Sequence, residues 1–217
     1  MLPRWTVITI GSITRNKFWG ERDEKSYRSI YCTSTLIKND NDIIMVDPSM
    51  EGEKMAEMLD FRCGLTPDKI TKVFVTHRHG DHCAGLSCFP NAQWFMMPKE
   101  LESGAADKEF KADRFTAAGE EISPGIHTIK LPGHTPGLGG LWFDAAEGRA
   151  VVTGDGVMTR DFFRRRMGYY NSADFEQASA SIEKLIEFAD VIVPGHDNYF
   201  MVKAAMADPE QEIVYSK

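Results

Sequence analysis

The sequence lacks the features of a disulfide-stapled, membrane-spanning or exported protein. Its cysteines are few, with no CxxC pair among Cys32, Cys63, Cys83 and Cys88, which favours small buried thiols in a reducing compartment. No stretch approaches the roughly 20 apolar residues that a membrane helix needs. The first ten residues also lack the basic and apolar regions of a signal peptide. We therefore expect a cytoplasmic protein with no membrane partner.

Positive charge is also in short supply. The chain holds 25 Lys and Arg against 32 Asp and Glu, a net charge of −7, which argues against binding polyanions through the whole surface. Nucleic acid is thus not the expected partner, and a small-molecule substrate is. Linkers and low-complexity segments are missing too, so residues 1–217 are expected to form a single globular domain. The oligomeric state stays open, with a homodimer as one alternative.

Short β-type runs and a few helical patterns make up the rest of the chain. Two helices are predicted, Glu51–Leu59 and Ser172–Ala189, the second capped by Asn171. Residues 12–29 are expected to form a long loop. Sheets covered by helices, in two comparable halves, are the predicted arrangement. The predicted strands are Thr6–Ile10, Ile30–Lys38, Ile43–Asp47, Lys72–Thr76, Ala92–Met96, Ile126–Leu131, Leu138–Phe143, Arg149–Thr153 and Val191–Val193.

The strongest chemical signal is the run His77-Arg78-His79-Gly80-Asp81-His82, directly after a predicted strand. In an extended chain His77 and His79 project to the same side, so both can reach one metal ion. Gly80 permits a sharp turn, which lets Asp81 and His82 face a second position. Neutral imidazoles and a carboxylate are ligands that suit zinc and similar ions.

Further candidate ligands stand in glycine-rich turns after predicted strands: His134, Asp155 and His196. Each alone is typical of an ordinary surface turn. Taken with the histidine motif, however, one site accounts for five of the six histidines. His127, inside a predicted strand, is left with a structural role. Asp47, before a proline, either holds the motif in place or caps a turn.

These residues resemble the metallo-β-lactamase superfamily, whose hallmark is a His-x-His-x-Asp-His loop followed by later His, Asp and His ligands. The match extends from the Asp47 region to His196, and by length the chain is similar to the small metallo-β-lactamase domain-containing proteins. The resemblance implies an α/β (α+β) fold, a four-layer αββα sandwich, with two divalent metal ions at one edge. Zinc is the expected metal, with iron or manganese as alternatives. By this resemblance one metal would be bound by His77, His79 and His134, the second by Asp81, His82 and His196, and both by Asp155, with Asp47 behind the motif.

The expected function is that of a metallo-hydrolase. Two divalent ions, two carboxylates and a bridging hydroxide leave a formal charge of about +1, which favours anionic substrates. The metal-bound hydroxide would cleave an ester, thioester, lactone or lactam bond in a small, anionic substrate. Asp81 would orient the nucleophile or carry its proton.

The segment 160–170 holds four arginines and four aromatic rings. Arg160, Arg164 and Tyr169 are candidates for binding substrate, through charge and stacking, but a solvated loop or a subunit contact explains the same composition. Two other activities also stay open. One is a phosphodiesterase or ribonuclease with the same dinuclear site, and the other is an iron-dependent oxidoreductase acting on thiols or oxygen. A non-catalytic binding module is disfavoured because all seven ligand positions are intact.

Overall fold

The computed structural model describes residues 1–22, 24–104 and 110–207, and its strands form two six-stranded sheets. The first sheet has the order β1-β2-β3-β4-β5-β6 and the second β12-β11-β10-β9-β8-β7. The strands of the first sheet are β1 (Arg4–Thr9), β2 (Ser34–Lys38), β3 (Ile43–Val46), β4 (Lys72–Phe74), β5 (Gln93–Met96) and β6 (Phe115–Ala117). Those of the second are β7 (Glu121–Ser123), β8 (Ile126–Lys130), β9 (Gly139–Ala145), β10 (Gly148–Gly154), β11 (Val191–Pro194) and β12 (Phe200–Met201).

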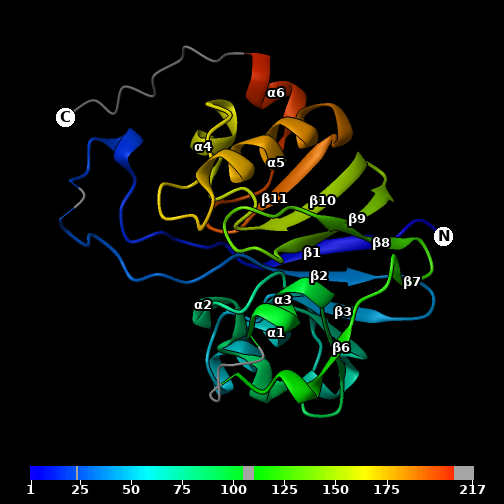
Figure 1. Cartoon of the computed structure of the whole chain (residues 1–217). Coiled ribbons are helices and arrows are strands. Elements are labelled where there is room, and N and C mark those ends of the chain that lie inside the picture. The colour runs from blue at the N-terminus through cyan, green and yellow to red at the C-terminus, as the bar shows by residue number, and fades with distance from the viewer. Residues whose placement is uncertain (23, 105–109, 208–217) are drawn as a thin grey trace.

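Helices cover the outer face of each sheet. Figure 1 shows α1, α2 and α3 on the side of the first sheet and α4, α5 and α6 on the side of the second. The α-helices are α1 (Glu53–Cys63), α2 (Gly80–Cys83), α3 (Pro98–Gly104), α4 (Arg160–Arg164), α5 (Phe175–Phe188) and α6 (Val202–Ala207). The 3₁₀ turns are η1 (Lys17–Trp19), η2 (Pro67–Lys69), η3 (Leu86–Cys88) and η4 (Ala112–Arg114).

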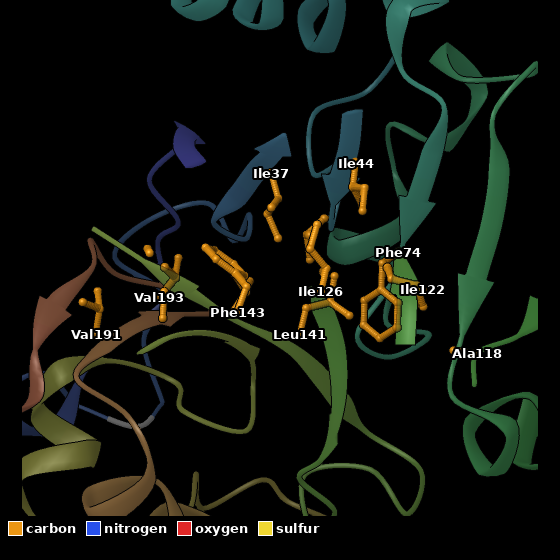
Figure 2. Close-up of a cluster of buried hydrophobic side chains, with 14 of the residues drawn as sticks. Ile37, Ile44, Phe74, Ala118, Ile122, Ile126, Leu141, Phe143, Val191 and Val193 are labelled. Atoms are coloured by element: carbon orange, nitrogen blue, oxygen red, sulfur yellow. The ribbon is translucent and has the colours of Figure 1, made fainter. Parts of the chain in front are cut away.

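The main hydrophobic core lies between the two sheets. Alternate side chains of each central strand point inward, and Ile37 and Phe74 from the first sheet meet Leu141 and Phe143 from the second (Figure 2). The outward-facing side chains of the first sheet pack against α1, and those of the second pack against α5. The order of layers is therefore helix, sheet, sheet, helix. The predicted α/β class and αββα sandwich are confirmed.

Strand direction decides where the loops gather. β3 and β4 are parallel, as are β10 and β11, whereas β9 is antiparallel to both β8 and β10. The strands β8, β10 and β11 therefore run the same way. Within each sheet, the loops that follow these parallel strands leave from one edge.

Three predicted boundaries differ from the structure by three or four residues. The helix predicted to end at Leu59 continues to Cys63. The strand predicted from Ile30 begins at Ser34, and the residues before it form only an isolated bridge between Tyr31 and Ser12. The helix predicted from Ser172 begins at Phe175.

The cap of α5 is therefore Asp174, whose Oδ1 accepts the Gln177 N–H at 2.9 Å, and not Asn171. The amides of Ala173 and Asp174 bond instead to the carbonyl oxygens of His134 and Gly133, at 3.1 and 2.9 Å. These bonds hold the preceding residues outside the helix.

Other expectations concern single residues and the membrane. His127 lies on β8 and stacks on Trp142 with 4.4 Å between ring centroids, which is a structural role. The four cysteines are free thiols. Within the described ranges, the structure contains no helix with the length and apolar character that a membrane span requires.

Candidate metal centre

Strand ends from both sheets bring the candidate ligands together. The motif His77–His82 follows β4 of the first sheet, and Asp47 follows the neighbouring strand β3. From the second sheet, His134 lies between β8 and β9, Asp155 follows β10, and His196 follows β11. Residues up to 149 positions apart in the chain, such as His196 and Asp47, thus belong to one edge of the sandwich.

A first cluster consists of three histidines and a carboxylate. His79 Nδ1 lies 2.9 Å from His77 Nε2 and 3.1 Å from His134 Nε2. Asp155 Oδ2 lies 3.2 Å from that same His134 nitrogen. One atom from each of the four residues lies within 4.8 Å of all the others, a spacing that suits a single bound ion.

A second cluster adjoins the first and shares Asp155 with it. Asp81, His82 and His196 each offer one atom within 4.8 Å of the others. The Oδ1 of Asp155, its other oxygen, lies 3.3 Å from His82 Nε2 and 3.2 Å from His196 Nε2. The two carboxylate oxygens of Asp155 therefore face different clusters, as a bridging ligand requires.

Hydrogen bonds to the outer ring nitrogens fix the histidines of the second cluster. The Nδ1 of His196 lies 2.9 Å from the Tyr31 carbonyl oxygen and 3.2 Å from that of Ser12. Carbonyl oxygens only accept, so this nitrogen carries the proton and the Nε2 lone pair faces the cluster. For His82 the partner of Nδ1 is Asp47 Oδ2, at 2.8 Å.

Asp47 joins the end of β3 to the histidine motif. Its Oδ1 accepts the Thr76 N–H at 2.8 Å, and its Oδ2 accepts the Thr76 hydroxyl at 2.7 Å as well as the His82 ring. Its backbone has φ 49°, a left-handed conformation in which Asp and Asn are the best-tolerated residues after glycine. The sequence analysis did not single out Thr76, whose only signal is a hydroxyl directly before the motif.

Burial and charge set the protonation of the first cluster. Burial, helped by the neighbouring His82, holds the pKa of His77 well below its usual value, and burial also lowers the pKa of His79 and His134. Burial opposes ionisation of Asp155, but the surrounding histidines, led by His196, outweigh it and hold the pKa of that carboxyl well below its usual range. Neutral imidazoles beside a carboxylate are the forms that bind a metal.

The second cluster favours positive charge. Burial disfavours the charged form of His82, yet the acidic groups of Cys32, Asp47 and Asp155 outweigh burial and raise the pKa of this ring well above its usual value. The pKa of His196 is raised as well, since Asp155 outweighs its burial. A proton or a metal ion is therefore stabilised at this point of the structure.

Buried polar atoms without a hydrogen-bond partner indicate whether a metal ion would fit between these residues. Four atoms of the second cluster are buried and make no hydrogen bond: Asp81 Oδ2, His82 Nε2, Asp155 Oδ1 and His196 Nε2. Each such atom ordinarily costs about 1–3 kcal/mol. Four of them directed at one another form a donor set that suits a divalent cation, so the residues fit the implied metal.

Of the three residues predicted to bind substrate, only Tyr169 has a ring contact with a candidate metal ligand. The Tyr169 ring lies 6.4 Å from the ring of His134, and its hydroxyl donates to the Tyr170 hydroxyl at 3.0 Å. Burial, together with Tyr170, raises the pKa of Tyr169, so the phenol is neutral at neutral pH. Arg160 is exposed on α4 and its guanidinium lies 5.7 Å from the Phe200 ring, and Arg164 is half-buried on the same helix.

The long loop expected at residues 12–29 is fastened to α4. Asp161 Oδ2 accepts the Asn16 side-chain amide at 3.0 Å and the Trp19 indole at 2.9 Å. Beneath these bonds Ile13 and Phe162 are buried in a small hydrophobic cluster that also includes Tyr169. Residues 13–19 thus pack on α4, and the Ser12 carbonyl oxygen lies 3.2 Å from His196 Nδ1, contacts that the polar sequence did not indicate.

The predicted role of Gly80 is wrong. Gly80 begins the short helix α2, its φ is not left-handed, and an added Cβ would meet no atom within 4 Å. The turn after His79 is made by this helix, so it does not depend on glycine.

Comparison with known proteins identifies the family. The sequence profile of the metallo-beta-lactamase superfamily matches residues 28–196, and the chain belongs to this superfamily. An N-acyl homoserine lactonase of Bacillus thuringiensis is 26% identical over 163 residues, which are 69% of this chain and 65% of the lactonase. The chain therefore matches somewhat less than two thirds of that relative.

Two further proteins are similar to this chain. The human metallo-beta-lactamase domain-containing protein 1 is 29% identical over 158 residues, 69% of this chain and 55% of the human protein. A solved structure of AidC, described as a dizinc quorum-quenching lactonase with a bound product, superimposes with a TM-score of 0.64 at 19% identity. The superposition covers 76% of this chain and 72% of AidC, and it shows that the two share a fold.

Proposed function

We propose that this protein is a metal-dependent hydrolase that opens a lactone at a dinuclear site. The observation that carries the proposal is the placement of Asp155, with one oxygen toward each of two buried ligand clusters. His77, His79 and His134 would hold one divalent ion and Asp81, His82 and His196 the other. Zinc is the expected metal, supported by the dizinc AidC with which the chain shares its fold.

The residues of the site have distinct tasks in this proposal. Two bound divalent cations lower the pKa of water and polarise a substrate oxygen. Asp81 is half-buried beside His82 and His196, and we expect it to orient the attacking water and take its proton. Asp155 would bind both metal ions, one through each oxygen. Its lowered pKa keeps the carboxylate ionised.

A lactone is the favoured substrate because the curated relative from Bacillus thuringiensis is named a lactonase. In ring opening, water oxygen bonds to the acyl carbon, the ring C–O bond breaks, and the departing alkoxide takes a proton. The product carries a new carboxylate, which a site of positive charge favours. The neutral Tyr169 hydroxyl, beside His134, is the side chain that we expect to hydrogen-bond the substrate.

Metal content and turnover test this proposal together. Elemental analysis of the purified protein should give about two zinc ions per chain. A panel of an N-acyl homoserine lactone, a thioester, a β-lactam and a phosphodiester should then show turnover of the lactone. A protein that takes up no divalent ion, or that cleaves only the phosphodiester, would contradict the proposal.

Removal of a single ligand should separate catalysis from folding. Asp81→Ala and His79→Ala should each lower lactone hydrolysis by about 100-fold or more, since groups that act as a unit lose most activity together. Neither side chain is fully buried, so the far-ultraviolet circular dichroism should be unchanged. His127→Ala is the matched control, because this histidine stacks on Trp142 and should retain activity. Retained turnover in Asp81→Ala would exclude its catalytic role.

A further inference from the structure

Glu100 is a buried carboxylate that belongs to neither ligand cluster. It lies in the first turn of α3 and is 0% exposed. Burying a charge is expensive unless hydrogen bonds and an opposite charge offset the lost hydration. At Glu100 the bonds come from two loops, and both carry candidate metal ligands.

The two oxygens of Glu100 bind different loops. Its Oε1 accepts the backbone N–H of Arg78 at 3.2 Å, and the Arg78 Nε lies 3.8 Å away. Its Oε2 accepts the Thr135 hydroxyl at 2.8 Å and the Gly137 N–H at 3.1 Å. Arg78 stands between His77 and His79, and Thr135 directly follows His134.

These bonds join two parts of the first cluster that are distant in sequence. His79 and His134 are 55 positions apart, yet their ring nitrogens lie 3.1 Å from each other. The loop after His134 also packs tightly on α3, since a Cβ added to Gly137 would collide with the Glu100 backbone. A single side chain on α3 therefore connects the two loops.

We propose that Glu100 is a positioning residue that holds His79 and His134 at the spacing the first metal requires, an inference that rests on the proposed function. A buried carboxylate suits this task because its two oxygens accept all three donors at once. An amide of the same shape cannot, because its nitrogen donates.

Glu100→Gln tests the role at constant size. If the amide nitrogen faces Arg78, two donors meet and the bond from the Arg78 N–H is lost. If it faces Thr135, the bond from the Gly137 N–H is lost for the same reason. Either orientation releases one ligand loop. Replacing residues that orient ligands typically costs about 10- to 100-fold in metal affinity, and we expect a loss of that size at one of the two metal positions.

Two variants of Thr135 test the same role if Glu100→Gln fails to fold. Thr135→Val removes one donor at nearly constant volume and leaves the carboxylate intact, whereas Thr135→Ser keeps the hydroxyl. We expect weaker metal binding in the valine variant and near-normal binding in the serine variant. Asp42→Asn is the control for general destabilisation, since Asp42 contacts Lys72 at the opposite end of β4.

Two measurements read out the variants. Zinc competition against a chromophoric chelator should show the loss of affinity at one position while the other is retained. Hydrogen exchange of the metal-free protein should show faster exchange at either the Arg78 or the Gly137 amide in Glu100→Gln, whichever faces the amide nitrogen, and unchanged exchange at both in Asp42→Asn. This second readout does not depend on activity.

The outcomes distinguish this inference from the proposed function. If the wild-type protein takes up no zinc, the proposed function fails and this role fails with it. If the wild type binds two zinc ions and opens lactones, while Glu100→Gln and Thr135→Val bind zinc as tightly as wild type, the inference alone is overturned. Equal loss of affinity in Asp42→Asn would likewise overturn it, by reducing the effect to general destabilisation.

Discussion

Individual side chains fix the candidate ligands mainly through atoms that point away from the site. The outer nitrogen of His82 is held by Asp47 and that of His196 by two main-chain carbonyl oxygens. These contacts select the tautomer and direct each Nε2 lone pair inward. Orientation of the second cluster thus depends on residues outside the two ligand clusters.

Asp47→Asn should weaken metal binding without distorting the backbone. Asn adopts the left-handed conformation found at this position nearly as readily as Asp, but it cannot accept all of the bonds from Thr76 and His82. We expect a fall of about 10- to 100-fold in zinc affinity, measured by chelator competition. Asp40→Asn, at an exposed carboxylate, is the control. Unchanged zinc affinity in Asp47→Asn would show that His82 needs no such support.

Among individual residues, the sequence indicated the histidines of the candidate site but not the more common residue types that support them. A histidine motif is conspicuous because its spacing already brings ligand atoms together. Thr76 and Glu100 are of ordinary types, and Glu100 stands in a short polar helix where nothing marks it for burial. Only their contacts across 29 and 35 positions of chain give them a role.

Among the secondary structure elements, length decided what could be predicted. The 14-residue helix α5 shows a clear apolar face, and the sequence predicted all of it but placed its start three residues too early. The helices α2 and α4 have four and five residues, too few to be stable alone because helix nucleation is unfavourable. Packing of the surrounding strands and loops stabilises these two helices, so no local sequence pattern predicts them.

Asp42→Asn should lower stability in a pH-dependent way. Burial alone would raise the pKa of Asp42, but hydrogen bonds from Lys72, Ser123 and Thr71 outweigh it and lower the pKa below its usual 3.8. The folded carboxylate thus adds stability above about pH 4, which is lost as the pH falls through the lowered folded pKa.

Denaturant unfolding at pH 7, 5 and 3.5 checks this prediction. At pH 7 and 5 the variant should be less stable by about 1–3 kcal/mol, the usual effect of leaving a partly buried partner unsatisfied. At pH 3.5 the difference should shrink, since the wild-type group begins to take up a proton. A difference that is constant over this range would mean that charge plays no part.

For the whole molecule, the main observation is that the two sheets contribute different candidate ligands. The motif after β4 comes from the first sheet, and His134, Asp155 and His196 come from the second. The candidate ligands meet only when the core between the sheets is packed, where Phe74 belongs to the same hydrophobic cluster as Leu141 and Phe143 (Figure 2). We therefore expect metal binding to be coupled to folding of the entire sandwich.

Removal of metal should lower the thermal stability of the whole protein. Free metal at 100 times its Kd stabilises the folded state by about 2.7 kcal/mol. For a chain of this size such a change corresponds to a Tm shift of about 5–10 °C. Scanning calorimetry before and after dialysis against a chelator should show the fall, and added zinc should reverse it. An unchanged Tm would contradict binding across the two sheets.

The sequence by itself determined the kinds of ligand, their order and the layered fold, because apolar periodicity and a dense histidine motif are local properties of the chain. Tertiary structure decided which atoms face each other: that Asp155 divides its oxygens between two clusters, that Asp47 and Glu100 support different parts of the site, and that the N-terminal loop lies against α4. These relations join segments far apart in the chain, and their geometry exists only once the two sheets have packed together.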